Sequence, residues 1–193
     1  MVMVESTMLP LGTPAPNFTL TDVVSGRTIT LSTFAGAPAL LVMFICRHCP
    51  FVKHVQAELA RLGRDYQPRG LAMVAISANS LQTHPQDGPD HLKAQAEELQ
   101  FTFPYCFDPT QETAKQYTAA CTPDFFLFDQ DKKLAYRGQL DDSRPSNGIA
   151  VSGKDLRAAI DAVLAGLPVA AEQRPAVGCN IKWTPGNEPS YFG

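Results

Sequence analysis

Two cysteines three positions apart, Cys46 and Cys49, are the residues of this chain best suited to do chemistry. They come where an apolar run over 39–45 gives way to a helical pattern, which places them at the end of a strand and the start of a helix. The unpaired N–H groups and the dipole of a helix N-terminus stabilise a thiolate. Because a thiolate attacks disulfides and peroxides, this arrangement predicts reversible disulfide chemistry.

Basic residues surround the pair. Arg47 and His48 lie between the two cysteines, and Lys53 and His54 follow on the expected helix. Positive charge close to a thiol favours its ionised form. The alternative is that both cysteines are inert, packed thiols. Their position at a junction between strand and helix argues against this alternative.

The composition suits one globular domain and disfavours several function classes. The chain has 193 residues, of which 45% are hydrophobic, with a formal net charge of -3 and a pI near 5.8. There is no basic run of the kind that binds nucleic acid. No apolar stretch approaches the roughly 20 residues that span a bilayer, and the first residues lack a signal-peptide pattern. We expect a cytoplasmic protein that binds neither nucleic acid nor membranes.

The elements that must position the dithiol can be read along the chain. An apolar strand, a helix from Pro50 and a second apolar strand over 71–76 predict a right-handed crossover with a parallel pair. We expect one domain over 1–193, with a core over about 13–166 and an irregular tail over 167–193. The other expected elements are a hairpin over 18–31, helices over 90–99, 109–119 and 152–164, a short strand over 104–107, and a hairpin over 125–137.

This order, with a dithiol after the first central strand, resembles the thioredoxin fold. The stretches 15–20 and 31–38 match the hairpin that precedes the core in the redoxin branch, and Thr122-Pro123 resembles the cis-proline loop. The stretches 44–53 and 178–183 are similar to a peroxiredoxin-like subgroup, related to alkyl hydroperoxide reductase and thiol-specific antioxidant, that carries a CxxC pair. The resemblance covers about 13–184. It implies an α/β three-layer sandwich with a mixed central sheet, an N-terminal hairpin extension and an irregular C-terminal tail.

The resemblance also implies roles for individual residues. Cys46, expected to be the more exposed thiol, would be the nucleophile, and Cys49 would resolve the mixed disulfide. Arg47 and His48 would support the thiolate. Pro123 would be cis and would place Thr122 against the dithiol, where the backbone of Thr122 would pair with an extended substrate.

Two departures from the related families affect the chemistry. Thioredoxin has a buried acid on the strand before its dithiol, and the strand over 39–45 has none. Either Glu58 or water would have to take the role of this acid. We expect Glu58 itself to be a solvated helix residue. Peroxiredoxins have a proline at position 42 and a threonine or serine at 46, where this chain has Val42 and Cys46. Cys49 followed by proline does resemble the peroxidatic Cys-Pro pair.

Five cysteines are an odd number, and the expected reducing compartment disfavours a structural disulfide framework. Cys121 should lie near the active site because it precedes Pro123 by two residues, either as a third redox thiol or as a buried small residue. Cys179 would be an accessory resolving thiol if the tail folds back, or a packed thiol otherwise. Cys106 is expected in the core.

The leading hypothesis is a thiol–disulfide oxidoreductase that cycles a disulfide between Cys46 and Cys49. A thiol-dependent peroxidase is the alternative. A zinc module using both cysteines with Cys121, Cys179 or a histidine, and a non-catalytic binding domain, are less favoured. No nucleotide or phosphate motif is present, so we expect no cofactor and no bound metal. The expected partners are protein or small-molecule disulfides and thiols, hydroperoxides under the alternative, and an unidentified electron donor.

Overall fold

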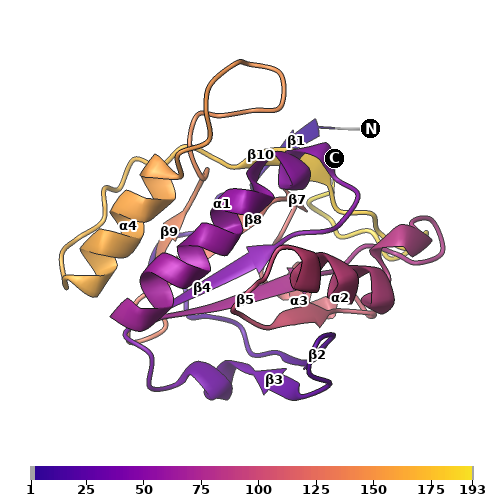
Figure 1. Ribbon diagram of the computed structural model, residues 1–193, viewed down its shortest axis with the longest axis horizontal. Helices are drawn as coiled ribbons and strands as arrows, with labels where there is room; N and C mark the ends of the chain where they lie inside the picture. Colours follow the sequence, from indigo (N-terminus) through magenta and orange to yellow (C-terminus); the bar gives the residue numbers. More distant parts are fainter. Residues whose placement is uncertain (1–2, 193) are drawn as a thin grey trace.

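The computed structural model describes residues 3–192 (Figure 1). Its helices are α1 (Pro50–Tyr66), α2 (Pro89–Glu98), α3 (Glu112–Gln116) and α4 (Lys154–Leu164). Its strands are β1 (Met3–Glu5), β2 (Thr19–Asp22), β3 (Thr28–Thr30), β4 (Ala39–Phe44), β5 (Leu71–Ser77), β6 (Tyr105–Phe107), β7 (Cys121–Thr122), β8 (Asp124–Phe128), β9 (Leu134–Arg137) and β10 (Val177–Asn180). Short 3-10 turns lie at Leu31–Phe34, Gln67–Arg69 and Pro85–Asp87.

Strand β4 lies inside a seven-stranded mixed sheet with the order β3-β2-β6-β5-β4-β8-β9. Every side chain of β4 is buried, as its apolar sequence predicts. The strand pairs in parallel with β5 and antiparallel with β8. The unit β4–α1–β5 is therefore the crossover expected from the sequence, and it sets the dithiol just beyond the carboxyl end of β4.

Both expected hairpins are present. Strands β2 and β3 pair antiparallel, and β2 joins the sheet through β6. Strands β8 and β9 form the second hairpin, at the other edge of the sheet. The N-terminal hairpin is thus an extension of the central sheet, as the resemblance implies.

Helices and loops cover both faces of the sheet, which gives the three layers expected. Leu41 and Met43 of β4 pack in one cluster with α1, α2 and α4. Leu40 and Val42, which alternate with them, pack in a second cluster with α3 and with tail residues such as Trp183. Figure 1 shows α1 and α4 side by side on one face. Within residues 3–192, no helix is long and apolar enough to cross a membrane.

The helix expected over 109–119 is much shorter than predicted. Helix α3 has five residues, because Gln111 before it adopts a left-handed backbone conformation with φ 65°. The carboxylate of Asp108 accepts the N–H groups of Gln111 (3.0 Å) and Ala114 (3.1 Å). Asp108 therefore closes a compact turn before α3 instead of starting a long helix.

The expectation that Glu58 is solvated is wrong. Only 2% of its side chain is exposed, and its carboxylate pairs with Arg61 (2.7 Å) and with Arg157 of α4 (2.6 Å). Two guanidinium groups satisfy this buried charge. Glu58 therefore ties α4 to α1.

The tail is irregular except for β10, and this strand forms a second sheet with the order β1-β10-β7. In this sheet Cys179 lies opposite Thr122, and Asn180 lies opposite Cys121. The C-terminal segment therefore folds back onto the loop that carries the cis-proline. This contact is the main feature of the fold that the sequence did not predict.

The close approach of β10 depends on Gly178. A Cβ atom at this position would lie 2.1 Å from the carbonyl oxygen of Thr122. We expect Gly178→Ala to force β10 away from β7 and to lower the free energy of unfolding by about 1–3 kcal/mol, the usual cost of overpacking. Urea denaturation measures the loss, and faster labelling of Cys179 by a thiol reagent reports the displaced strand.

Gly36→Ala is the matched control, because a Cβ atom there would meet open space. Its unfolding free energy should stay within about 0.5 kcal/mol of the parent value. Equal stability and equal labelling of the two variants would show that β10 does not depend on this approach.

Candidate active site around Cys46 and Cys49

The loop between β4 and α1 positions the two thiols. Cys49 is the N-cap residue of α1, with an extended backbone, and Pro50 is the first helical residue. The backbone N–H of Val52 in the first turn is one of the groups that lower the pKa of Cys49. The predicted location of the pair, at a strand end and a helix start, is confirmed.

The expected difference in exposure between the two thiols is wrong. Cys46 and Cys49 are both fully buried, and all five cysteines are free. They share one apolar cluster with Cys121 and Cys179. The folded-back β10 strand puts Cys179 beside Cys49, so the tail helps to keep both members of the dithiol away from water.

Thr122 contacts both thiols, as the resemblance implied. The Thr122–Pro123 peptide bond is cis. The hydroxyl of Thr122 lies 3.4 Å from the sulfur of Cys46, and its carbonyl oxygen accepts from Cys49, in the thiol form, at 3.2 Å. However, the backbone of Thr122 is not free to pair with an extended substrate, because β10 already occupies that edge.

The hydrogen bonds among the thiols favour ionisation of Cys49. Contacts from Cys179 and Cys46 lower the pKa of Cys49 to about 2, although burial opposes ionisation. The hydrogen bond to Cys49, together with burial, raises the pKa of Cys46 well above its usual value. The same two causes raise the pKa of Cys179. Among these three sulfurs, the hydrogen bonds and burial favour ionisation of Cys49 over that of Cys46 or Cys179.

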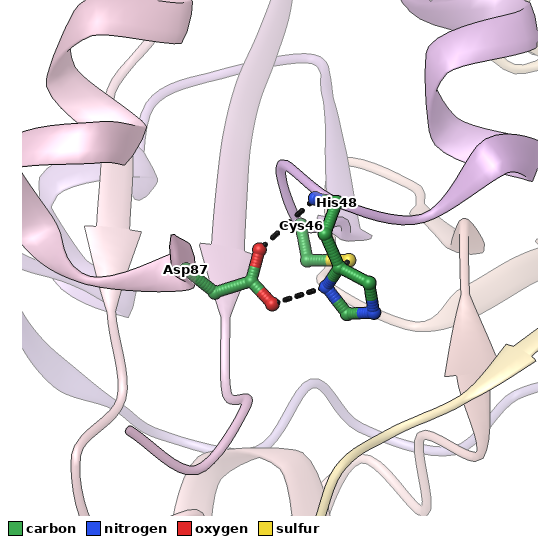
Figure 2. Close-up of side chains that lie close together, drawn as sticks. All are labelled: Cys46, His48 and Asp87. Carbon is green, nitrogen blue, oxygen red and sulfur yellow. Dashed lines mark hydrogen bonds and ion pairs between the residues drawn. The ribbon is translucent and has the colours of Figure 1, made fainter. Parts of the chain in front are cut away.

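A buried carboxylate that the sequence analysis missed holds the dithiol loop. Asp87 has no exposed surface, and it accepts the backbone N–H groups of Arg47 (2.9 Å) and His48 (3.1 Å). It also bonds to Nδ1 of His48 at 2.5 Å and to the amide of Asn79 at 2.8 Å. Figure 2 shows the imidazole of His48 beside both Asp87 and Cys46.

These contacts keep Asp87 ionised. Burial by itself raises the pKa of a carboxyl, but the hydrogen bonds from His48 and Asn79 outweigh it and lower the pKa of Asp87. Nδ1 of His48 lies 3.8 Å from the sulfur of Cys46, so this ring connects the carboxylate to the dithiol. Asp87 belongs to a polar loop with no recognisable spacing relative to the CxxC pair, and no signal in the sequence alone pointed to it.

The basic residues near the pair have different roles. His48 is part of the site, but the guanidinium of Arg47 donates to the carbonyl oxygen of His91 at 2.7 Å. The contribution of Arg47 to the site is its backbone N–H. His54 bonds to Ser143, near the proline loop. The ring of His84 packs against that of His48 in a tilted arrangement, with ring centroids 4.7 Å apart, which the sequence did not suggest.

The ligand atoms of Cys46, His48 and Asp87 lie within 4.8 Å of one another and resemble part of a metal site. The donor set fits a metal poorly. The oxygens of Asp87 already accept two backbone N–H groups, the amide of Asn79 and His48, and Zn²⁺ sites use four ligands. A metal ion would have to displace the contacts that hold the loop.

The two remaining cysteines lie in different places. Cys121 is buried near Pro123, as expected, and its thiol lies 3.5 Å from the carbonyl oxygen of Pro123 and 3.9 Å from that of Ala176. Burial raises the pKa of Cys121. Cys106 is buried in the cluster on the other face of the sheet, which confirms the expected core position.

The chain is similar to known proteins in both sequence and fold. Residues 11–137 match the sequence model of the AhpC/TSA family. No curated protein matches the chain. A crystal structure of an uncharacterized conserved protein from Geobacillus kaustophilus is 56% identical, with a TM-score of 0.94, and the match covers 96% of this chain and 98% of that one. A hypothetical protein from Sinorhizobium meliloti 1021 is 48% identical, with a TM-score of 0.91 and 93% and 98% coverage.

A more distant structure identifies the fold. The thioredoxin domain of a thiol-disulfide oxidoreductase from Bacteroides vulgatus has a TM-score of 0.57 and 19% identity, and the match covers 67% of this chain and 88% of that one. At this identity the likeness shows the fold alone. Together with the mixed sheet and its covering helices, it confirms the thioredoxin-like three-layer architecture expected from the sequence.

Removing the charge of Asp87 should weaken the fold in a pH-dependent way. We expect Asp87→Asn to lower the unfolding free energy at pH 7 by about 1.5–3 kcal/mol, because it loses charge-assisted hydrogen bonds to a buried carboxylate. The lowered pKa means that this contribution is present above the unfolded-state pKa, about 3.9, and is lost as the pH falls through the folded-state value. Urea denaturation at pH 7 and near pH 3 measures both effects.

Asp131→Asn, an exposed substitution in the turn between β8 and β9, is the control and should change stability little at either pH. The difference between Asp87→Asn and the parent protein should shrink at the acidic pH. A constant difference at both pH values would contradict the assignment of Asp87 as an ionised anchor.

Proposed function

The chain belongs to the AhpC/TSA family, and from this membership and the geometry of its dithiol we propose that it is a thiol–disulfide oxidoreductase cycling a disulfide between Cys46 and Cys49. The family is one of redoxin-type oxidoreductases. The observation that carries the proposal is the position of the two thiols at the N-terminus of α1, where both sulfurs contact Thr122, the residue before the cis-proline.

The order of events follows from the charge on Cys49. Its thiolate attacks one sulfur of a substrate disulfide, forms a mixed disulfide and releases the first substrate thiolate, which takes up a proton. Cys46 then loses its proton and attacks the sulfur of Cys49, which releases the second substrate thiolate and forms the Cys46–Cys49 disulfide. Two electrons pass to the substrate, and an unidentified donor restores the dithiol. The sequence assigned the first attack to Cys46, and the hydrogen bonds support the reverse order.

The contacts of Cys46 bear on the second step. Cys46 has a raised pKa, so it needs help to ionise when it attacks. Nδ1 of His48 lies within 3.8 Å of its sulfur and is held by Asp87. The N–H group at Nδ1 of His48 donates to Asp87, so the hydroxyl of Thr122, 3.4 Å from the sulfur, is the donor that favours the developing Cys46 thiolate.

The position of β10 favours small substrates. A protein substrate that paired its backbone with Thr122 would have to displace Cys179 and its neighbours from that edge. A low-molecular-weight disulfide does not need to pair with the backbone of Thr122 and has only to reach the sulfur of Cys49. Of the expected partners, small-molecule disulfides and thiols therefore fit best. The cytoplasmic location and the absence of nucleic-acid and membrane partners stay predictions from the sequence.

A thiol peroxidase is the second candidate function, and the position of Cys49 favours it. Cys49 and Pro50 resemble the peroxidatic Cys-Pro pair, and the pKa of Cys49 is lowered. In this reaction the thiolate attacks the terminal oxygen of a hydroperoxide, the O–O bond breaks, and an alcohol or water leaves after protonation. Cys46 then attacks the sulfenic acid of Cys49 and releases water as the disulfide forms. Val42 and Cys46, where peroxiredoxins have proline and threonine or serine, argue against an efficient peroxide pocket.

Serine variants separate the roles of the two cysteines. Incubated with a small aromatic disulfide, Cys46→Ser should accumulate a mixed disulfide at Cys49, because no partner thiol remains at 46 to resolve it quickly. Cys49→Ser should lose turnover to the background of uncatalysed exchange. Mass spectrometry of the intact protein detects the adduct, and Cys106→Ser, far from the site, should behave like the parent. Full turnover in both variants would refute the dithiol cycle, and an adduct in Cys49→Ser alone would restore Cys46 as the attacking thiol.

The peroxidase candidate predicts that the reduced protein consumes hydrogen peroxide much faster than a free thiol does, with sulfenic acid trapped at Cys49 in the Cys46→Ser variant. Stopped-flow kinetics with a sulfenic-acid probe measures both. A rate no higher than that of free cysteine would leave disulfide exchange as the reaction. Metal analysis of untagged protein tests the zinc alternative. Reversible oxidation of the dithiol would argue against a non-catalytic binding module, which has no need of it.

A further inference from the structure

Strand β10 occupies the place where an extended substrate would dock. It pairs antiparallel with the residue before the cis-proline, and Cys179 lies directly opposite Thr122. Gly178 allows this approach, since any larger residue would collide with the Thr122 carbonyl. Strand β1 pairs with the other edge of β10 and holds it in place. The chain therefore presents one of its own cysteines to the dithiol on an extended strand.

Cys49 shares one buried cluster with the thiols of Cys46 and Cys179. Hydrogen bonds from Cys179 and from Cys46 are the two largest causes of its lowered pKa. The backbone geometry also brings Cys179 close to Cys49. Cys179 lies opposite Thr122 in an antiparallel pair, where the Cα atoms are about 4.5–5.5 Å apart, and the carbonyl oxygen of Thr122 is 3.2 Å from the sulfur of Cys49. Cys179 and Cys46 thus approach the same sulfur.

We propose that Cys179 is a second disulfide partner of Cys49, so that β10 acts as a built-in substrate strand. The inference rests on the proposed dithiol cycle and deepens it. Starting from the Cys46–Cys49 disulfide, the thiol of Cys179 loses its proton and its sulfur attacks Cys49. The new Cys49–Cys179 bond forms as the Cys46–Cys49 bond breaks, and the Cys46 thiolate takes up the proton. No electrons enter or leave, so no further oxidant is required.

The exchange has a consequence for the site. It returns Cys46 to the thiol form, beside His48 and Thr122, while the oxidising equivalent is held on the tail. It also links β10 covalently to the start of α1, which locks the tail over the site. Reduction of the Cys49–Cys179 disulfide would free Cys49 for another cycle and release the tail. The C-terminal segment therefore takes part in the redox cycle and does more than cover the dithiol.

The other cysteines are placed differently. Cys121 is also buried close to the proline loop, but its thiol is directed to the backbone carbonyl groups of Pro123 and Ala176. Cys106 packs on the opposite face of the sheet. These two cysteines serve as internal controls, because nonspecific oxidation would involve them as readily as Cys179.

Tryptic mapping can separate all five cysteines, since cleavage after lysine and arginine places each in its own peptide. Cys46 lies in 28–47, Cys49 in 48–53, Cys106 in 94–115, Cys121 in 116–132 and Cys179 in 158–182. The folded, reduced protein is treated with one equivalent of diamide, quenched with acid and alkylated. The variants are Cys46→Ser, Cys46→Ala in case the serine disturbs folding, Cys46→Ser/Cys179→Ser, and Cys106→Ser.

We expect the Cys46 variants to link 48–53 to 158–182 as the main product, and the double variant to lose that link. The parent protein and Cys106→Ser should show the 28–47 to 48–53 link together with a smaller amount of the Cys49–Cys179 link. If the Cys46 variants retain the native circular dichroism spectrum but leave Cys49 unlinked, dimerised or joined to Cys121, Cys179 is only a packed thiol and the inference is wrong. If the parent protein forms no Cys46–Cys49 link at all, it is the proposed function that fails.

Discussion

A buried charge without hydrogen-bond partners strongly destabilises a fold. The conformation of the dithiol loop depends on this constraint, because the loop supplies hydrogen-bond donors to the buried carboxylate of Asp87. The backbone N–H groups of Arg47 and His48 both point to that carboxylate. This arrangement fixes the path of the chain from β4 into α1 and sets Cys49 at the helix cap. The same carboxylate orients the His48 ring next to Cys46. The reactive geometry therefore depends on one residue 40 positions away in the sequence.

The second constraint is the exclusion of water by β10. In a site of low dielectric, a hydrogen bond to an ion is stronger and an unpaired ion is less stable than in water. Burial therefore keeps Cys46 and Cys179 protonated, while their hydrogen bonds stabilise the thiolate of Cys49. A single charge is concentrated on one sulfur. The tail that closes the edge beside Thr122 to extended peptides also creates this asymmetry.

The fold was largely predictable because its signals are local. The buried strand before the dithiol and the apolar stripe of α1 follow from short stretches of sequence, and the resemblance to the thioredoxin fold implied the cis-proline loop. The missed features depend on distant contacts. No pattern connects Asp87 to the CxxC pair, the burial of Glu58 depends on a salt bridge from α4, and the pairing of β10 depends on the return of the tail. The proposed order of the two thiols also depends on a distant residue, since the hydrogen bond from Cys179 favours ionisation of Cys49.

The central claim is that Cys46 and Cys49 form a reversible disulfide, and a redox titration tests it most directly. The protein is equilibrated across a graded series of thiol–disulfide buffers, quenched and mapped by its tryptic peptides. We expect a single two-electron transition in which peptides 28–47 and 48–53 become linked, with a midpoint between about -270 mV for a reductant and about -120 mV for an oxidant. A dithiol that stays reduced across the whole series, while the protein keeps its fold, would contradict it.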